Sequence, residues 1–348
     1  MSPPTQKTVT FTPSGSVLLD LALGGGWAND RVSNLVGDRS TGKTLVAIEH
    51  IINFIRQYGE ANTATRYGEA EAAFDDSYAA LLGFPGSVQK PLERIRTVED
   101  FYKDLSKFIK DNKGKKMLYV LDSLDALSSD AEMKRELGDA TYGAEKAKAM
   151  SELFRRIVQD MEEHHCHLQV ISQVRDNIGV TFGEHYSRSG GKALDFYASQ
   201  VVWLAQSGKI EKTFHGISRP VGVGIKSNVK KNKVALPYRT AEFPILFGYG
   251  IDDETSMNDW LTGIKAFNKE EGDAFTEQLK RGRKDGTNSA LLKEVHTQLE
   301  TRTKIEWAAI EEALRPKTKK YYDPPANNNS NSSTQVAPRP AIPSRTTT

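Results

Sequence analysis

Short apolar runs alternate with longer amphipathic stretches over the first 250 residues, which is typical of strands and helices that follow one another. The apolar runs predict strands at residues 32–36, 64–68, 117–121, 168–173, 198–205, 222–226 and 241–247. The other stretches predict helices at residues 45–54, 76–82, 98–110 and 144–163, and a short apolar helix with a serine cap and a glycine stop within residues 14–26. This alternation predicts an α/β fold with a largely parallel, twisted sheet.

The two ends of the chain have a different character. Residues 1–12 form a short polar arm, in which residues 8–11 could form an edge strand, either in this chain or on a neighbouring subunit. Polar helices are predicted at 257–265, 270–281, 290–302 and 305–314, and proline, asparagine and serine dominate the remainder. We therefore expect an arm (1–12), a core (13–252), a small helical C-terminal region (253–315) and a disordered tail (316–348).

Composition narrows the class of protein only modestly. The 348 residues are 38% hydrophobic and carry a formal net charge of +2, so a nucleic-acid surface would have to be a local patch. Cys166 is the single cysteine, which excludes an internal disulfide and fits a reducing compartment. No run approaches the about 18 apolar residues of a membrane span. We expect a soluble, cytoplasmic protein without a membrane partner.

The most informative motif follows the first core strand. Residues 37–44 match the phosphate-loop pattern G-x-x-x-x-G-K-[ST], and a predicted helix follows at once. Backbone N–H groups of such a loop cradle phosphate oxygens, its lysine meets the β- and γ-phosphates, and its hydroxyl binds Mg²⁺. The candidate nucleotide-binding residues are Gly37, Asp38, Arg39, Ser40, Thr41, Gly42, Lys43 and Thr44.

Acidic residues end two of the predicted strands. Glu69 and Glu71 follow the strand at 64–68, and Asp122 follows the strand at 117–121. Open parallel sheets bind ligands at the carboxyl ends of their strands. Asp122 can therefore hold Mg²⁺ through water beside Thr44. Residues 174–192 are long, glycine-bearing and mixed in polarity, which predicts a functional loop.

The run His164, His165, Cys166 and His167 has the composition of a metal site. It lacks the second spaced pair of ligands that structural zinc sites use, and it leads directly into a predicted strand. We therefore interpret it as a helix end and packing residues.

Over residues 13–250 the chain resembles the RecA family of ATP-dependent DNA strand-exchange proteins. Residues 14–26 are similar to the lead-in to the family's phosphate loop, and residues 69–83 to its acidic segment. Residues 131–139 resemble its first DNA-binding loop, and residues 173–199 resemble its second DNA loop with the return helix. Other ATPases with this core fold lack the second-loop signature.

The resemblance assigns roles at the nucleotide. Glu71 matches the general base that orients water, with Glu69 as the alternative, and Gln173 matches the γ-phosphate sensor. Asp75 and Tyr78 match positions that meet the adenine. The resemblance also makes Lys231 and Lys233 catalytic residues that reach the ATP of the adjacent subunit, so that hydrolysis would require a filament; an ordinary basic turn is the alternative interpretation.

The resemblance also implies DNA contacts. The candidates for phosphate contacts are Ser151, Arg155, Arg175 and Lys192, assisted by the backbone of Gly190 and Gly191. Ile178 and Phe182 would be apolar loop residues that wedge between bases, although Phe182 could equally anchor the loop on protein.

Four departures from the family stand out. Bacterial members begin with a helix that packs on the next subunit, whereas only residues 1–12 precede the core here. The first DNA loop is more charged, at residues 145–148, and Asp176 replaces an apolar residue in the second. The tail is basic where bacterial members end in an acidic segment, so we expect no acidic brake and a non-specific DNA contact instead.

The resemblance implies a DNA-dependent ATPase that uses ATP and Mg²⁺, forms a filament on single-stranded DNA, and pairs it with homologous duplex DNA. The alternative is an ATPase on the same fold without strand exchange, such as a helicase motor or a regulator. A DNA-binding scaffold with vestigial hydrolysis is a third hypothesis, against which Glu71 argues. The second-loop motif and the lysines Lys231 and Lys233 favour the recombinase.

Overall fold

The structure is a computed structural model that describes residues 8–71, 75–91, 93–134, 144–176, 186–188, 191–286 and 289–317. The chain divides into two units, residues 1–308 and residues 309–348. The second unit, as far as it is described, consists of the last turns of a long helix. The predicted disordered tail, from residue 318 onward, lies outside the described residues.

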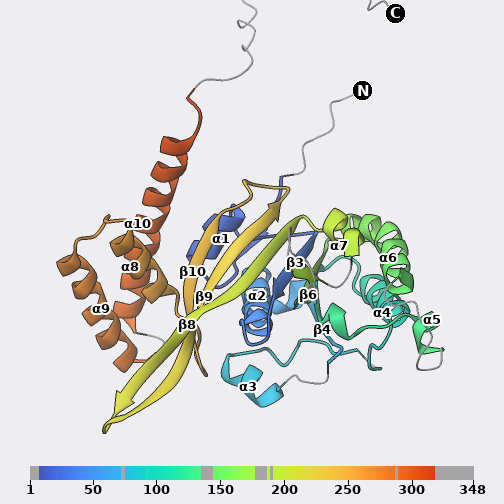
Figure 1. Ribbon diagram of the computed structural model, residues 1–348, viewed down its shortest axis with the longest axis horizontal. Coiled ribbons are helices and arrows are strands. Elements are labelled where there is room, and N and C mark those ends of the chain that lie inside the picture. Colours follow the sequence, from blue (N-terminus) through green and yellow to red (C-terminus); the bar gives the residue numbers. More distant parts are fainter. Residues whose placement is uncertain are drawn as a thin grey trace, which may run out of the picture. The chain divides into compact units, whose positions relative to one another are not determined.

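A mixed sheet organises the first unit, in the strand order β11-β10-β9-β8-β3-β6-β5-β4 (Figure 1). Five adjacent strands are parallel: β8 (Gln200–Phe214), β3 (Val32–Gly37), β6 (Cys166–Asp176), β5 (Lys116–Asp122) and β4 (Thr63–Glu69). The sheet continues antiparallel through β9 (Ile217–Asn232), β10 (Thr240–Leu246) and β11 (Gly250–Ile251). The predicted α/β fold with a largely parallel sheet is confirmed.

Helices cover both faces of the sheet and create two cores. Helices α1 (Val17–Leu23) and α2 (Lys43–Tyr58) pack on one face, while α4 (Val98–Asp111), α6 (Ala144–Glu163) and α7 (Gly191–Tyr197) pack on the other. Side-chain caps determine where two of these helices begin. The Ser16 side chain accepts a hydrogen bond from Leu19 N at the start of α1, and the Thr97 side chain accepts one from Asp100 N at the start of α4. The shorter elements are η1 (Glu60–Asn62), α3 (Asp76–Leu81), η2 (Leu124–Ala126) and α5 (Asp130–Met133).

The register of the parallel strands brings their carboxyl ends to one edge. Gly37 of β3 lies opposite Gln173 of β6, and Glu69 of β4 lies opposite Asp122 of β5. The phosphate loop therefore opens beside the strand ends that carry the predicted acids.

Three helices follow the sheet, namely α8 (Asp253–Gly263), α9 (Lys269–Lys284) and α10 (Ala290–Leu314). Their apolar faces share a cluster that includes Met257, Leu279 and Leu299. The sequence predicted two helices at 290–302 and 305–314, but α10 is continuous. No glycine or proline interrupts it, and Thr303 at the expected break is buried. None of the helices in the described ranges is long and apolar enough to span a bilayer.

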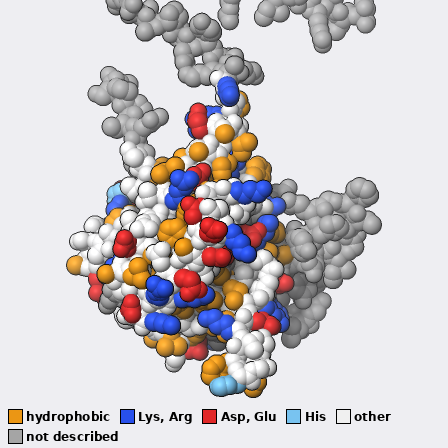
Figure 2. Space-filling view, turned by 90° about the vertical axis from the view of Figure 1, so that its left-hand side faces the viewer, with side chains coloured by type: hydrophobic (Ala, Val, Ile, Leu, Met, Phe, Trp, Pro, Cys, Tyr) orange, Lys and Arg blue, Asp and Glu red, His pale blue; other side chains and the backbone are white. Residues whose placement is uncertain are grey.

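Strands β8 and β9 are much longer than the apolar pattern predicted. Beyond Ile210 of β8 and Gly222 of β9, where the pairing of β9 with β10 ends, they form a two-stranded hairpin that extends past the rest of the sheet (Figure 1). Its tip is a two-residue turn, His215 and Gly216, with both φ angles positive, as a type I′ turn requires. Phe214 and Ile217 flank the turn and are 76% and 60% exposed, and Figure 2 shows apolar side chains beside a histidine there. The hairpin escaped prediction because neither of its faces is buried.

The N-terminal arm does form a strand, but it pairs within the chain. Strand β1 (Phe11–Thr12) is antiparallel to β2 (Trp27–Ala28). The Gln57 amide of α2 donates to the carbonyl oxygen of Phe11 at 2.9 Å, and Thr12 Oγ1 donates to Asn29 Oδ1 at 2.9 Å. The arm thus contributes the expected edge strand, at Phe11–Thr12, and it pairs within its own chain rather than with a neighbouring subunit.

The segment predicted as a loop at 174–192 is partly regular. Strand β6 continues to Asp176, where it pairs antiparallel with β7 (Tyr186–Arg188), and α7 begins at Gly191. Residues 177–185, 189 and 190 lie outside the described residues.

Candidate nucleotide-binding site

The phosphate loop joins β3 to α2 and is shaped by its glycines. A Cβ on Gly37 would lie 2.4 Å from Thr41 Oγ1 and 2.8 Å from the Leu204 carbonyl oxygen, so no larger residue fits. Gly42 is left-handed at φ 79°, and a Cβ there would lie 2.4 Å from Ile245 Cδ1. The two glycines therefore let the loop pass tightly from β3 into the start of α2, and the start of a helix is where an anion binds.

Lys43 lies at the first position of α2, among carboxylates. Its Nζ donates to the carbonyl oxygen of Asp38 at 2.6 Å. Burial lowers the pKa of the ammonium group, whereas the charges of Asp122, Glu71, Asp38 and Asp125 oppose that shift. A cation is thus held at the carboxyl edge of the sheet, where phosphate oxygens would bind.

Thr44 and Asp122 lie in direct contact. Thr44 Oγ1 donates to Asp122 Oδ2 at 2.7 Å, which joins the first turn of α2 to the end of β5. Burial raises the pKa of the Asp122 carboxyl, and hydrogen bonds from Tyr67 and Thr44 partly offset the effect. Hydroxyl and carboxylate oxygens are the ligands that Mg²⁺ prefers, so this pair fits a magnesium ion.

Glu71 and Gln173 are also brought together. Glu71 Oε1 accepts hydrogen bonds from Ser123 Oγ and from Gln173 Nε2, the latter at 2.7 Å. The Gln173 backbone N–H donates to Asp125 Oδ2 at 2.6 Å. A continuous polar chain therefore links the acidic segment after β4 to β6. Glu69, the alternative base, is half-buried and lies opposite Asp122 in the pairing of β4 with β5.

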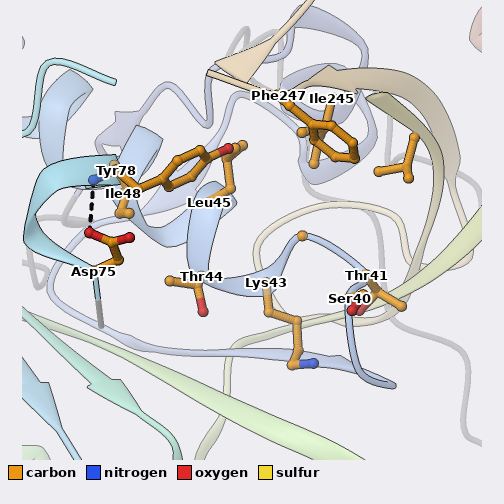
Figure 3. A pocket seen from close by; sticks show the side chains of 12 residues that line it. Ser40, Thr41, Lys43, Thr44, Leu45, Ile48, Asp75, Tyr78, Ile245 and Phe247 are labelled. Carbon is orange, nitrogen blue, oxygen red and sulfur yellow. Dashed lines mark hydrogen bonds between the residues drawn. The ribbon is translucent and has the colours of Figure 1, made fainter. Parts of the chain in front are cut away.

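A cavity of about 300 Å³ opens beside the phosphate loop (Figure 3). The Tyr78 ring lies on one side with Leu45 and Ile48, and Phe247 and Ile245 lie on the other. Asp75 caps α3, since its Oδ1 accepts hydrogen bonds from the backbone N–H groups of Ser77 and Tyr78. The cavity has the size and apolar walls expected for a nucleotide base.

The residues that sequence reasoning missed come from distant strands. Val223, Ile245 and Phe247 line the cavity from β9 and from the end of β10. The apolar run at 241–247 signalled a strand, but nothing local indicated that its end would face the phosphate loop.

Lys231 and Lys233 lie away from the phosphate loop of their own chain. Both side chains donate to the Phe196 carbonyl oxygen, at 3.3 and 2.7 Å, and Lys231 also donates to the Asp195 carbonyl oxygen. Lys231 pairs with Val201, which pairs with Asn34 near the start of β3. Asn34 precedes Gly37 by about 10 Å at about 3.3 Å per residue. The two lysines thus lie toward the edge of the sheet that carries the amino end of β3, whereas the phosphate loop follows its carboxyl end.

The predicted DNA contacts are only partly described. On α6, the Arg155 side chain is exposed and its Nε donates to the Ser151 carbonyl oxygen at 3.2 Å. Arg175 lies in β6, and Gly191 and Lys192 begin α7, all described by their backbone. Outside the described residues lie Ile178, Phe182 and Gly190.

The histidine and cysteine run does not converge on one point. The exposed His165 ring donates from Nδ1 to Asp30 Oδ2 at 2.7 Å, and Cys166 is buried in the core under α4 and α6. The buried His167 contacts Ser33 Oγ at 2.8 Å. In the parts of the chain that the structure describes, no group of three histidine, cysteine or acidic side chains could hold a metal ion.

A largely parallel sheet with a phosphate loop after one central strand and an acid after a neighbouring one defines a P-loop nucleoside triphosphatase core. The model of the RecA N-terminal domain matches residues 2–252. The chain belongs to the RecA family.

Curated relatives agree with this assignment. The chain is 33% identical over 252 residues to Protein RecA of Trichodesmium erythraeum, an alignment that covers 72% of this chain and 66% of the relative, slightly less than two thirds. It is 34% identical over 294 residues to Protein RecA of Mycobacterium ulcerans, covering 82% and 80% of the two chains. The resemblance inferred from the motifs is confirmed. ATP-dependent recombination and repair, with DNA-dependent ATP hydrolysis, is the class of function that these comparisons support.

Proposed function

We propose that this chain is a DNA-dependent ATPase that forms a filament on single-stranded DNA and catalyses pairing and strand exchange with homologous duplex DNA. Family membership supports the class of reaction. The single observation that carries the detailed proposal is the hydrogen bond from Gln173 to Glu71. It connects the hydrolysis site to β6, the strand that leads into the predicted second DNA loop.

At the phosphates, each residue has a role that its position supports. The phosphate loop and Lys43 bind the β- and γ-phosphates, and the Thr44 hydroxyl with the Asp122 carboxylate would hold Mg²⁺. The ion, when bound, supplies charge neutralisation on the phosphate oxygens. Glu71 orients water for attack on the γ-phosphate, releasing ADP and phosphate. Hydrogen bonds from Ser123 and Gln173 fix its carboxylate for that role.

The adenine would enter the cavity between Tyr78 and Phe247. An aromatic ring on either side provides the stacking surface that a planar base needs. Asp75 acts mainly by holding the start of α3, because its carboxylate is used as the helix cap. Tyr78 is thereby fixed at the mouth of the cavity.

Lys231 and Lys233 act on a neighbouring subunit. Their position toward the amino edge of β3 keeps them from the phosphate loop of their own chain, which opens at the carboxyl edge. A subunit stacked on that loop could present both ammonium groups to the transferred phosphate. Hydrolysis would then depend on filament assembly.

DNA would contact the side of the molecule that carries α6, β6 and α7. Arg155 presents an exposed guanidinium there, with Ser151 one turn earlier. We assign phosphate contacts to these residues, to Arg175 and Lys192, and to the backbone of Gly190 and Gly191. Ile178 and Phe182 would contact bases, and sequence would be read by base pairing.

ATP turnover with and without single-stranded DNA tests the proposal. Glu71→Gln should remove most DNA-stimulated turnover while nucleotide binding persists, whereas Glu69→Gln is a matched control that should retain turnover. Electron microscopy with DNA and a non-hydrolysable ATP analogue should show helical filaments. Full turnover in Glu71→Gln, or closed rings with no pairing of homologous duplex, would contradict the proposal and favour a motor or regulatory ATPase.

A further inference from the structure

Tyr67 brings an unassigned hydroxyl group to the magnesium site. It lies in β4, is 1% exposed, and belongs to the core on the α2 face of the sheet. Its phenol donates to Asp122 Oδ2 at 2.5 Å. Thr44 Oγ1 donates to that same oxygen at 2.7 Å. Three elements, β4, β5 and α2, thus meet at one carboxylate oxygen.

The two hydrogen bonds restrict how Asp122 can face a metal ion. A carboxylate oxygen offers about two lone-pair directions, so two donors on Oδ2 direct further contacts to Oδ1. The donors also come from different elements, which prevents the carboxylate from rotating about its terminal bond. The Tyr67 ring cannot follow such a rotation, because the core encloses it. The ring also packs edge-on against the Phe84 ring, with their centroids 6.2 Å apart.

We propose that Tyr67 is a positioning residue for Mg²⁺, which orients the Asp122 carboxylate so that Oδ1 faces the water shell of the ion. The inference rests on the proposed nucleotide site and adds a residue that no motif marks. A partner that orients a metal ligand commonly changes metal affinity about 10- to 100-fold when it is removed. Tyr67 therefore sets how much Mg²⁺ the site needs to bind ATP tightly.

The chain contains a matched control on the next strand. Tyr119 of β5 is also buried, and its phenol donates to a carboxylate, Asp104 Oδ2, at 2.8 Å. It belongs to the core on the opposite face of the sheet, under α4. Tyr67→Phe and Tyr119→Phe therefore remove the same group from equally buried sites, but only the first touches Asp122.

The test measures binding of a fluorescent, non-hydrolysable ATP analogue by the full chain over a Mg²⁺ titration and in EDTA. Tyr67→Phe should raise the Mg²⁺ concentration at half-maximal tight binding about tenfold and leave affinity in EDTA unchanged. Tyr119→Phe should match wild type in both measurements, even if its melting temperature falls.

A wild-type Mg²⁺ requirement in Tyr67→Phe would overturn the inference while leaving the proposed function intact. An equal shift in both variants would overturn it as well, since a general loss of stability would then be the cause. In an Asp122→Asn background Tyr67→Phe should add nothing, and a further tenfold shift there would also refute it. Wild-type protein that binds no ATP would instead overturn the proposed function, and this inference with it.

Discussion

Removal of the Gln173 side chain should uncouple DNA affinity from nucleotide. In the structure, Gln173 Nε2 donates to Glu71 Oε1 at 2.7 Å, while the Gln173 backbone N–H donates to Asp125. Gln173→Ala removes the first contact and keeps the second, because the backbone is unchanged. The expected result is a protein that still binds ATP and DNA but no longer binds DNA more tightly when ATP is present.

The expected size follows from the kind of hydrogen bond that is lost. Hydrogen bonds to charged groups contribute about 1.5–3 kcal/mol. The Gln173–Glu71 bond is exposed to solvent, so the lower end of that range applies. About 1.4 kcal/mol corresponds to a tenfold change in an equilibrium constant. We therefore expect the ATP-dependent gain in DNA affinity to fall about tenfold.

The assay is fluorescence anisotropy of a labelled single strand with and without a non-hydrolysable ATP analogue. Because coupling between two binding sites is reciprocal, the effect of DNA on the affinity for the analogue should fall by the same factor. Ser123→Ala is the matched control, since it removes the other donor to the same Glu71 oxygen without touching β6. It should lower turnover and preserve the coupling.

Two outcomes would refute this reasoning. Gln173→Ala could retain the full ATP-dependent gain in DNA affinity, which would show that the side chain does not carry the signal. Ser123→Ala could lose as much coupling as Gln173→Ala, which would show that the orientation of Glu71, rather than its link to β6, is what matters.

Two further predictions concern assembly and pH. Lys231→Ala protein mixed with Glu71→Ala protein should recover part of the DNA-stimulated turnover that each lacks alone, because some interfaces then combine an intact base with intact lysines; no recovery at any mixing ratio counts against shared sites. Burial raises the pKa of the Asp20 carboxyl from 3.8 to about 7, although the Ser14 hydrogen bonds lower it. Between about pH 4 and pH 7 the folded state therefore binds more protons than the unfolded state. The Asp20 carboxyl thus lowers the free energy of unfolding as the pH rises through this range. In denaturant melts, the free energy of unfolding of Asp20→Asn should equal that of wild type near pH 4 and exceed it at pH 8. An equal difference between the two proteins at both pH values would contradict the assignment.

Local chemistry made much of the site predictable from sequence. The phosphate loop is a contiguous stretch whose glycines and lysine have fixed tasks, and the structure places it after β3 as expected. Glu71 and Asp122 could be predicted to approach the loop because the carboxyl ends of parallel strands share one edge. Gln173 lies level with Gly37 for the same reason.

Features that depend on register or on distant packing could not be predicted in this way. In the sequence, Tyr67 looks like any aromatic residue of a strand. Only the pairing of β4 with β5 shows that its hydroxyl reaches Asp122. Phe247 faces the cavity because β10 runs antiparallel beside β9. The outer half of the β8–β9 hairpin is exposed, so its residues lack the apolar alternation by which strands are recognised.

The contacts of helix α7 suggest an intrinsic reporter of assembly. Lys231 and Lys233 place two cations on the last carbonyl groups of this short helix, where positive charge stabilises a helix end. If docking of a neighbour draws these side chains to its phosphates, α7 loses its anchors as the interface forms. Amide hydrogen exchange in residues 193–197 would then quicken on assembly, although most buried interfaces slow exchange. The same two lysines would thus exchange an intramolecular contact for an intermolecular one.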